Sequence, residues 1–462
     1  MLVFKFGGTS VGSAERFRSV AEVIAGARGR GLVVILSAMS GVTNALVAGA
    51  RAAEEGDERR YLAIRDDLLA RHLGVVADLL PAGAEREALE AEVAARLDDY
   101  ERLCRSIATL GELTLRGNDA VASLGEGLST RILAAHLRAC GVRARAVSAT
   151  VCVRTDSQHG AARPDLAETR RLVDRHVRPL VEAGVVPVVT GYIGSDARGV
   201  VTTLGRGGSD YSAAILGTAL DAEEVTIWTD VNGILTADPR LVPEAQTLAE
   251  LSYQEAEELA YFGASVLHPK TVAPLAARGI PLRIVNSLSP AEPGTRIVPR
   301  PSATRVRRPA IISTQGLSLV GVTGQGEGWS LHLASRALRA LAEAGLDVMM
   351  FSQSFSERSL NVVLAREEQA HDLRVLEREF EKERALGIVA RIGVQGEVAT
   401  VSVVGMPNGA EAPTARAYAA LGALGVRVVS IGQAASEYSV SLVIPEGEVA
   451  RAVPFLHREL GL

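Results

Sequence analysis

The chain has 462 residues, 47% hydrophobic and 22% charged, with a formal net charge of −5. This length allows about three domains of roughly 150 residues each, and the composition is ordinary for a globular protein. The small net charge argues against nucleic acid or an anionic membrane as a partner. Three cysteines without metal-ligand spacing indicate a reducing compartment. A start directly in a strand pattern, and no run of about 18 apolar residues, predict a cytoplasmic protein.

The N-terminus predicts a strand, a glycine turn and a helix. VFKF at residues 3–6 is the strand, GGTS at 7–10 is the turn, and Ser13 caps a helix with apolar residues at helical spacing. Glycines before a helix N-terminus suit a phosphate group, because the backbone N–H groups there are unpaired. One such turn is a weak signal, since a plain strand-to-helix connection has the same composition.

The next strand pattern, LVVIL at residues 32–36, is apolar throughout and predicts a strand buried in a parallel sheet. It ends in SAMSGVTN at 37–44, where ligands bind in open α/β sheets, although helix capping alone would explain the serines. Long amphipathic helices are then predicted from Arg51 to about Arg116. SLGEGLST at 123–130 follows, and Glu126 there could be an ordinary acid in the first turn of a helix.

A second strand, glycine turn and helix start is predicted at VTTLGRGGSDYSAA, residues 201–214. The glycines and the helix N-terminus suit an anion, and Arg206 adds a planar fork for a carboxylate or phosphate. Asp210 adds the opposite charge, which indicates that a cationic group is also held there.

The strand at 225–228 then leads into TDVNGILTADPR, where Asn-Gly and Asp-Pro predict a loop. In VLHPKT at 266–271, His268 before proline is expected to be structural, and Lys270 is the functional candidate.

The C-terminal third repeats itself. FSQSFSERSLNVVL at residues 351–364 returns 80 residues later as IGQAASEYSVSLVI at 431–444, and each copy follows an apolar strand and an Ala-rich helix. Two copies of one small strand-helix-strand-strand unit are therefore predicted. The proline-rich and arginine-rich stretch before the repeat predicts an interdomain connection.

KFGGTS together with TTLGRGGSD resembles the aspartate kinases of the amino acid kinase superfamily, and the GE-x-LS and WTDV…ADPR stretches agree. The resemblance implies an α/β amino acid kinase fold, an open and mostly parallel sheet between helices, over residues 1–290 with a helical insertion at about 51–116. A linker at 291–312 and two α+β ACT domains of βαββαβ type, at 313–394 and 395–462, complete the expected architecture.

The same resemblance implies transfer of a phosphoryl group from ATP to the side-chain carboxylate of L-aspartate, with Mg²⁺ arriving on ATP. In this scheme Lys5 and Lys270 flank the moving phosphoryl group, and Asp210 holds one or both of their ammonium groups. The implied substrate contacts are Ser37, Thr43, Glu126, Arg206 and Ser209, with Glu126 facing the amino group. The implied nucleotide contacts are Gly7, Gly8, Thr9, Ser10, Gly207, Gly208, Thr229, Asp230, Ile234, Asp238 and Arg240.

ACT domains bind amino acids between paired units, which implies feedback control by an end product of the aspartate pathway to lysine, threonine, methionine and isoleucine. Gln353, Ser354 and Gln433, in the matching SQSFSE and GQAASE stretches, favour threonine over lysine. The plain alternative is that the repeat only mediates dimerisation. Pairing of ACT domains implies a homodimer or homotetramer.

Two alternatives to an aspartate kinase remain at this point. A superfamily kinase for another carboxylate or a carbamate is disfavoured by the combination of Glu126 with Arg206. A catalytically silent amino-acid sensor is disfavoured because Lys5, Asp210 and Lys270 are all retained. Since the chain ends at Leu462, directly after the second repeat, we expect a monofunctional kinase without a homoserine dehydrogenase.

Overall fold

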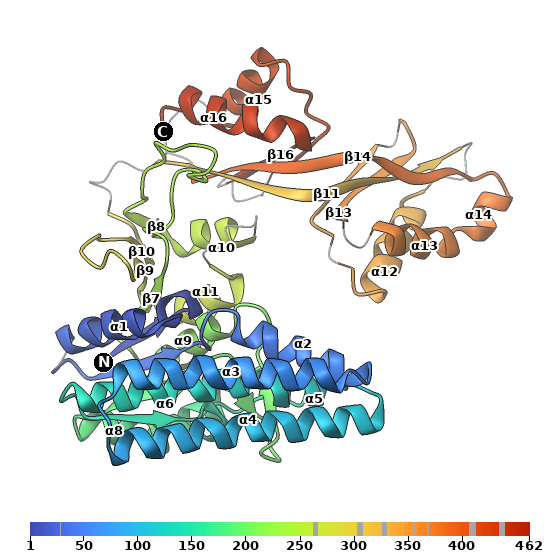
Figure 1. The fold of residues 1–462 in the computed structure, drawn as a ribbon. Helices are drawn as coiled ribbons and strands as arrows, with labels where there is room; N and C mark the ends of the chain where they lie inside the picture. The colour runs from blue at the N-terminus through green and yellow to red at the C-terminus, as the bar shows by residue number, and fades with distance from the viewer. Residues whose placement is uncertain are drawn as a thin grey trace. The chain divides into compact units, whose positions relative to one another are not determined.

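The structure is a computed structural model of the chain. It describes residues 1–27, 29–261, 267–302, 308–325, 330–346, 348–354, 356–366, 369–405, 413–433 and 439–462, and gives the backbone alone for 369–372, 413 and 433. The chain forms two compact units (Figure 1). Unit 1 comprises Met1–Ile234, Thr247–Glu257 and Ser265–Ser302, and unit 2 comprises Leu235–Gln246, Glu258–Ala264 and Ala303–Leu462.

Unit 1 is built on an eight-stranded sheet with the order β3-β4-β2-β1-β7-β9-β10-β8. Its strand pairs are parallel except β9 with β10. Central strands such as β2 are buried along their whole length, as a parallel sheet covered on both faces requires. The predicted open, mostly parallel α/β sheet is confirmed. The strands are β1 (Leu2–Phe6), β2 (Leu32–Leu36), β3 (Ala144–Val147), β4 (Val186–Thr190), β7 (Glu224–Thr229), β8 (Glu250–Ser252), β9 (Leu282–Asn286) and β10 (Thr295–Val298).

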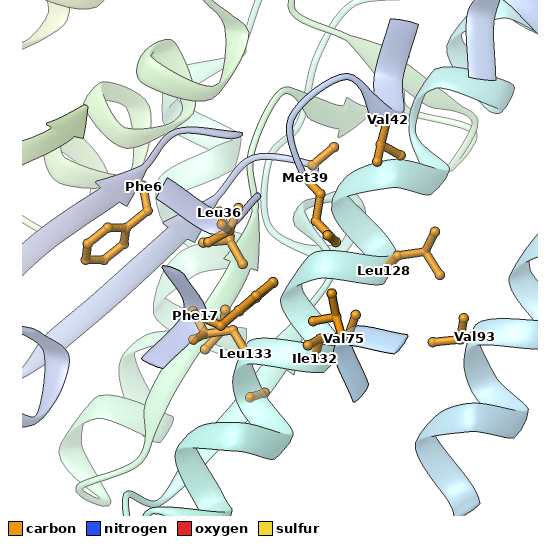
Figure 2. Close-up of a cluster of buried hydrophobic side chains, with 14 of the residues drawn as sticks. Phe6, Phe17, Leu36, Met39, Val42, Val75, Val93, Leu128, Ile132 and Leu133 are labelled. Atoms are coloured by element: carbon orange, nitrogen blue, oxygen red, sulfur yellow. The ribbon is translucent and has the colours of Figure 1, made fainter. Parts of the chain in front are cut away.

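Helices cover the central strands. One face packs into a hydrophobic core in which Phe6 and Leu36 from the sheet lie with Phe17, Met39 and Leu128 from the surrounding helices and loops (Figure 2). Helix α9 contacts β1 and β7, and α7 and α11 contact α9. A small hairpin, β5 (Ile193–Ser195) and β6 (Val201–Thr203), precedes α9. The helices are α1 (Ala14–Gly26), α5 (Leu115–Ala122), α6 (Leu124–Ala139), α7 (Leu166–His176), α8 (Arg178–Glu182), α9 (Gly208–Ala219), α10 (Tyr253–Tyr261) and α11 (Pro269–Ala276).

The predicted helical stretch between residues 51 and 116 is confirmed. It contains the end of α2 (Val42–Glu54), all of α3 (Glu58–Leu79) and α4 (Ala84–Leu110), and the start of α5. Asp57 caps α3 by accepting a hydrogen bond from Arg60 N at 3.1 Å, and Gly111 ends α4 with φ of 66°. The apolar stripe of α4 is buried against α3 and α2, while its charged residues form ion pairs at the surface.

Unit 2 contains a six-stranded antiparallel sheet with the order β12-β13-β11-β14-β16-β15. The predicted repeat is confirmed, because a strand, a helix and two further strands occur twice, each time with a helix following them. The elements are β11 (Ala310–Gly324), α12 (Leu331–Glu343), β12 (Met350–Ser354), β13 (Ser359–Ala365), α13 (Gln369–Glu379), α14 (Glu381–Ala385), β14 (Val389–Val404), α15 (Pro413–Ala423), β15 (Ser430–Gln433), β16 (Ser439–Pro445) and α16 (Val449–Glu459).

The two copies of the repeat exchange strand segments. The long strands β11 and β14 pair along almost their whole length, with register shifts that include one between Thr314 and Leu317 (Figure 1). Ile311, at the start of β11, packs in the core with α15 and α16 of the second copy. Val389, at the start of β14, packs in the core with α12 of the first copy. Each copy therefore lends a strand segment to the core of the other.

One segment from the middle of the chain, Leu235–Gln246, groups with unit 2. Thr236 Oγ1 and His457 Nε2 share a buried hydrogen bond of 2.9 Å, and Ile311 N donates to Thr236 O at 2.8 Å. Ala237 and Val242 are buried in the same core. Among the helices that the structure describes, none combines the length and apolar character needed to cross a membrane.

Candidate active site

The candidate site lies at the carboxyl end of β1. This strand pairs in parallel with β2 on one side and with β7 on the other, so the strand order diverges there. Such a switch point leaves a crevice between the loops that follow neighbouring strands, and ligands of open α/β sheets bind in it. The loops after β1 and β2 contact each other, with Ser40 N donating to Gly8 O at 3.1 Å. A Cβ atom at Gly8 would lie 2.9 Å from the carbonyl oxygen of Ala38, so glycine allows this close approach.

Lys5 of β1 forms an ion pair with Asp210, in the first turn of α9. Lys5 Nζ lies 2.6 Å from Asp210 Oδ1, and the two side chains are 10% and 17% exposed. Charges shielded from water in this way interact more strongly than charges at the surface. The structure thus brings two of the three predicted catalytic residues into contact.

Glu126 is a buried carboxyl group in the first turn of α6. Its Oε1 accepts a hydrogen bond from Ala38 N at 3.3 Å, and its Oε2 has no hydrogen-bond partner in the part of the chain that the structure describes. Burial raises the pKa of Glu126 to about 8. A buried polar atom without a partner is costly, so this oxygen is suited to receive a donor from a ligand.

The turn at residues 204–208 presents Arg206 and opens α9. Gly205 and Gly207 have φ of 77° and 70°, a conformation that residues with a side chain rarely adopt. A Cβ atom at Gly207 would also lie 2.7 Å from Cβ of His268. The first N–H groups of a helix lack intrahelical acceptors and carry partial positive charge, so the start of α9 suits an anion.

These loops line a pocket of about 650 Å³. It contains a buried carboxyl group, a guanidinium group and a shielded ion pair, which together can hold a zwitterion next to an anion. The predicted site residues that line it are Lys5, Gly8, Thr9, Ser37, Thr43, Glu126, Arg206, Gly207, Gly208, Ser209, Asp210 and Asp230.

Several predicted nucleotide contacts lie beside this pocket rather than in its lining. Gly7 N donates to Trp228 O at 3.2 Å, which joins the glycine turn to the end of β7. Ser10 is 1% exposed, and its hydroxyl group hydrogen-bonds to Ser287 Oγ at 2.8 Å. Ser287 N in turn donates to Thr229 O at 2.7 Å. These contacts brace the loops that form the pocket.

The remaining predicted nucleotide contacts lie further along the same loop. Ile234 is buried, and its N–H group donates to Thr295 Oγ1 at 2.8 Å. Asp238 and Arg240 belong to the segment that groups with unit 2, and they pair with each other at 2.6 Å. The Arg240 guanidinium lowers the pKa of Asp238. Their predicted contact with a nucleotide stays a prediction.

Lys270 has an exposed side chain in the first turn of α11. Its backbone N–H group donates to Nδ1 of His268, which caps this helix at 3.2 Å. The pKa of His268 is lowered, first by burial and then by the charges of Lys270 and Arg206. Lys270 therefore lies within electrostatic reach of the Arg206 turn, although it does not line the pocket.

The predicted effector residues lie in β12 and β15, which are the two edge strands of the unit 2 sheet. Gln353 in β12 has a buried Nε2 atom without a hydrogen-bond partner among the described residues. Ser354 accepts a hydrogen bond from Glu357 N at 3.2 Å and thus supports the turn after β12. Gln433 is the last residue of β15, and its side chain lies outside the described residues. The two strands approach each other, since Ser430 Oγ donates to Ser352 Oγ at 3.2 Å.

Tyr192 is a pocket residue that sequence reasoning missed. Its φ is 68°, a strained value for a residue with a side chain, and its N–H group donates to Ser212 Oγ at 2.9 Å. Burial raises its pKa, and nearby Glu126 raises it further. The sequence showed only a turn at this place, and nothing in the turn pattern indicated that Tyr192 would line the pocket.

Two family profiles match this chain. That of the amino acid kinase family matches residues 1–286, and that of the ACT domain matches residues 401–460. The first match covers more than half of the chain, so the chain belongs to the amino acid kinase family.

Relatives narrow this assignment. Aspartokinase 1, chloroplastic, from Arabidopsis thaliana is 33% identical over 473 residues, which cover 99% of this chain and 79% of the relative. Within the amino acid kinase family, the chain therefore belongs to the aspartokinases. Bifunctional aspartokinase/homoserine dehydrogenase 1, chloroplastic, from Zea mays is 32% identical over 462 residues, which cover 98% of this chain and 50% of the relative. The chain spans about half the length of such bifunctional relatives.

Solved structures agree with this assignment. Escherichia coli aspartokinase III in complex with aspartate and ADP superimposes with a TM-score of 0.82 at 28% identity, over 100% of this chain and 99% of that one. The same enzyme in complex with lysine and aspartate gives a TM-score of 0.80 at 28% identity, over 100% of both chains. The predicted family, with its kinase fold and ACT-type sheet, is confirmed.

Proposed function

We propose that this protein transfers the γ-phosphoryl group of ATP to the side-chain carboxylate of L-aspartate, giving ADP and 4-phospho-L-aspartate. The observation that carries the proposal is the unpartnered carboxyl oxygen of Glu126 in the same pocket as Arg206. A carboxylate suits the ammonium group of an amino acid, and a guanidinium group suits a carboxylate. The aspartate and ADP bound to the Escherichia coli relative support this choice of substrates.

The chemistry requires positioning and positive charge more than covalent help from the protein. The aspartate carboxylate is ionised at neutral pH and needs no general base. Its oxygen forms a bond to the γ-phosphorus, while the bond from that phosphorus to the β–γ bridging oxygen breaks and ADP leaves with the electron pair. Lys5, held by Asp210, neutralises the moving phosphoryl group, and Lys270 supplies the second positive charge.

ATP enters as its magnesium complex in this proposal. The glycine turn after β1 and the start of α9 offer backbone N–H groups to the phosphate oxygens. Mg²⁺ is held mainly by phosphate oxygens and water, as is usual for this ion. Among the described residues no three His, Cys, Asp or Glu side chains form a group that could hold a metal ion.

The product belongs at the first step of the pathway to lysine, threonine, methionine and isoleucine, with the ACT domains as the place of feedback control. We favour threonine as effector and keep lysine as the alternative, which the lysine bound to the Escherichia coli relative supports. A homodimer or homotetramer formed through the ACT domains, and a cytoplasmic location, are also part of the proposal.

The test is ATP- and Mg²⁺-dependent formation of a hydroxamate in the presence of hydroxylamine. L-aspartate is compared with succinate, which lacks the ammonium group, and with L-glutamate as an alternative acceptor. Carbamate, whose phosphate would give hydroxyurea rather than a hydroxamate, is followed by ADP release. The assay is repeated with threonine, with lysine and with both. Hydroxamate formed from aspartate, and much less from succinate, is the expected result.

Two outcomes would contradict the proposal. Preferential phosphorylation of another acceptor would favour a different kinase of the family. A folded protein that binds an amino acid in a calorimeter but forms no acyl phosphate would be a sensor rather than an enzyme.

A further inference from the structure

Asp119 is a buried carboxylate outside the pocket, and it connects the segment that carries Glu126 with the segments that support Arg206. Asp119 is fully buried in α5, and α5 leads through Ser123 directly into α6, which carries Glu126. A buried carboxylate is costly unless hydrogen bonds satisfy its oxygens. The groups that donate hydrogen bonds to Asp119 therefore show which segments of the chain it holds together.

The donors come from two segments that are distant in sequence. Thr203 Oγ1, at the end of β6, donates to Asp119 Oδ1 at 2.5 Å. His159 Nδ1 donates to Oδ2 at 2.8 Å, and Gly160 N lies 3.1 Å from both oxygens. One carboxylate thus joins α5 to the loop at residues 157–162 and to β6.

The loop and the strand that Asp119 joins both support the Arg206 turn. Ala162 N donates to Thr203 O at 2.8 Å, so the loop runs along the end of β6. A Cβ atom at Gly205 would lie 3.1 Å from the carbonyl oxygen of Gly160, which shows how closely the turn rests on the loop. Gly160, Gly205 and Arg206 all line the pocket.

From this arrangement we propose that Asp119 is a positioning residue for the amino-acid substrate. Through the loop at 157–162 and the end of β6, it fixes the Arg206 turn relative to the helix that carries Glu126. The inference rests on the proposed function, because it assigns Glu126 and Arg206 to the two ends of one substrate. Loss of the carboxylate leaves Gly160 N without its acceptor and frees Thr203, so the guanidinium group samples more orientations.

The test compares wild type with Asp119→Asn, which keeps the size of the side chain but cannot accept all these hydrogen bonds. In the hydroxamate assay, we expect the KM for L-aspartate to rise at least tenfold while the KM for ATP changes less than twofold. Glu255→Gln is the matched control, because Glu255 is also buried and accepts hydrogen bonds from the N–H and hydroxyl groups of Ser252, outside the loop at 157–162 and the Arg206 turn. This control is expected to lower stability and leave both KM values unchanged.

Hydrogen exchange gives a readout that does not need activity. Peptides covering residues 157–162 and 203–209 should exchange faster in Asp119→Asn than in wild type and in Glu255→Gln. If Asp119→Asn does not fold, Thr203→Val removes one donor and should shift both readouts in the same direction by a smaller amount. Unchanged exchange, or an equal rise of both KM values, overturns the inference. A wild type without hydroxamate activity would instead refute the proposed function, and the exchange data would still decide whether Asp119 holds the loop.

Discussion

Replacing Glu126 by glutamine removes the charge of the predicted ammonium site and keeps its shape. The amide oxygen can still accept the hydrogen bond from Ala38 N, which Oε1 now receives at 3.3 Å. The second oxygen has no protein partner among the described residues, so its substitution breaks no described hydrogen bond. The change therefore affects the ligand more than the fold.

The expected loss follows from the strength of the missing interaction. A hydrogen bond to a charged group contributes about 1.5–3 kcal/mol, and about 1.4 kcal/mol corresponds to a factor of ten in affinity. The KM for L-aspartate should rise about 10- to 150-fold. Turnover at saturation should change little, because the ammonium group is remote from the reacting carboxylate and contributes uniform binding.

The pH dependence of the wild type gives a second, independent check on Glu126. Burial raises its pKa to about 8, so the carboxyl group of the free protein is largely protonated at neutral pH. Pairing with an ammonium group requires the ionised form, and substrate binding must then release a proton. The value of kcat/KM for aspartate should rise up to about tenfold per pH unit from pH 6 to 8 and level off above.

The assay is hydroxamate formation from pH 6 to 9 with wild type and Glu126→Gln, and thermal unfolding serves as the control for folding. The variant should lose the slope that the wild type shows below pH 8. Identical profiles for the two proteins, or a KM for aspartate within twofold of wild type, would refute the assignment of Glu126 to the amino group.

Other substitutions test the proposed phosphate site and the proposed effector site. Lys5→Ala and Lys270→Ala should each lower kcat by orders of magnitude through the loss of positive charge, and near-normal turnover in either variant would remove that lysine from the mechanism. Gly8→Ala places a Cβ atom 2.9 Å from a backbone carbonyl oxygen and should raise the KM for ATP at least tenfold, whereas Gly12→Ala, with its nearest atoms at 3.7 Å, should not. Gln353→Ala should weaken inhibition by threonine or lysine with little change in turnover, and full inhibition would place the effector elsewhere.

Much of the fold could be predicted because its signals are local. The apolar run of β2 indicates a strand in a parallel sheet, and the 80-residue repeat indicates duplication without any tertiary information. The exchange of strand segments between the copies could not be predicted in this way. Pairing of Ala310 with Val404, for example, depends on contacts between distant parts of the chain and on register shifts within the ladder.

The residues of the candidate site divide in the same way, into those with a local sequence signal and those that depend on distant contacts. Lys5, Glu126, Arg206 and Asp210 could be predicted because each lies in a short motif at a strand end or a helix start, and the structure gathers them around one pocket. Asp119 could not, because its role comes from donors as far as 84 residues away along the chain.

The exchanged strands also bear on how such a duplicated unit can be inherited. A deletion that removed the second copy would take away the strand that pairs with residues 310–314 and the core around Ile311, leaving an unpaired apolar edge. Neither copy is therefore a self-sufficient module that recombination could add or discard alone. A twist imposed on β11 or β14 in one copy continues along the same backbone into the core of the other, so a structural change in one copy is transmitted directly to its neighbour.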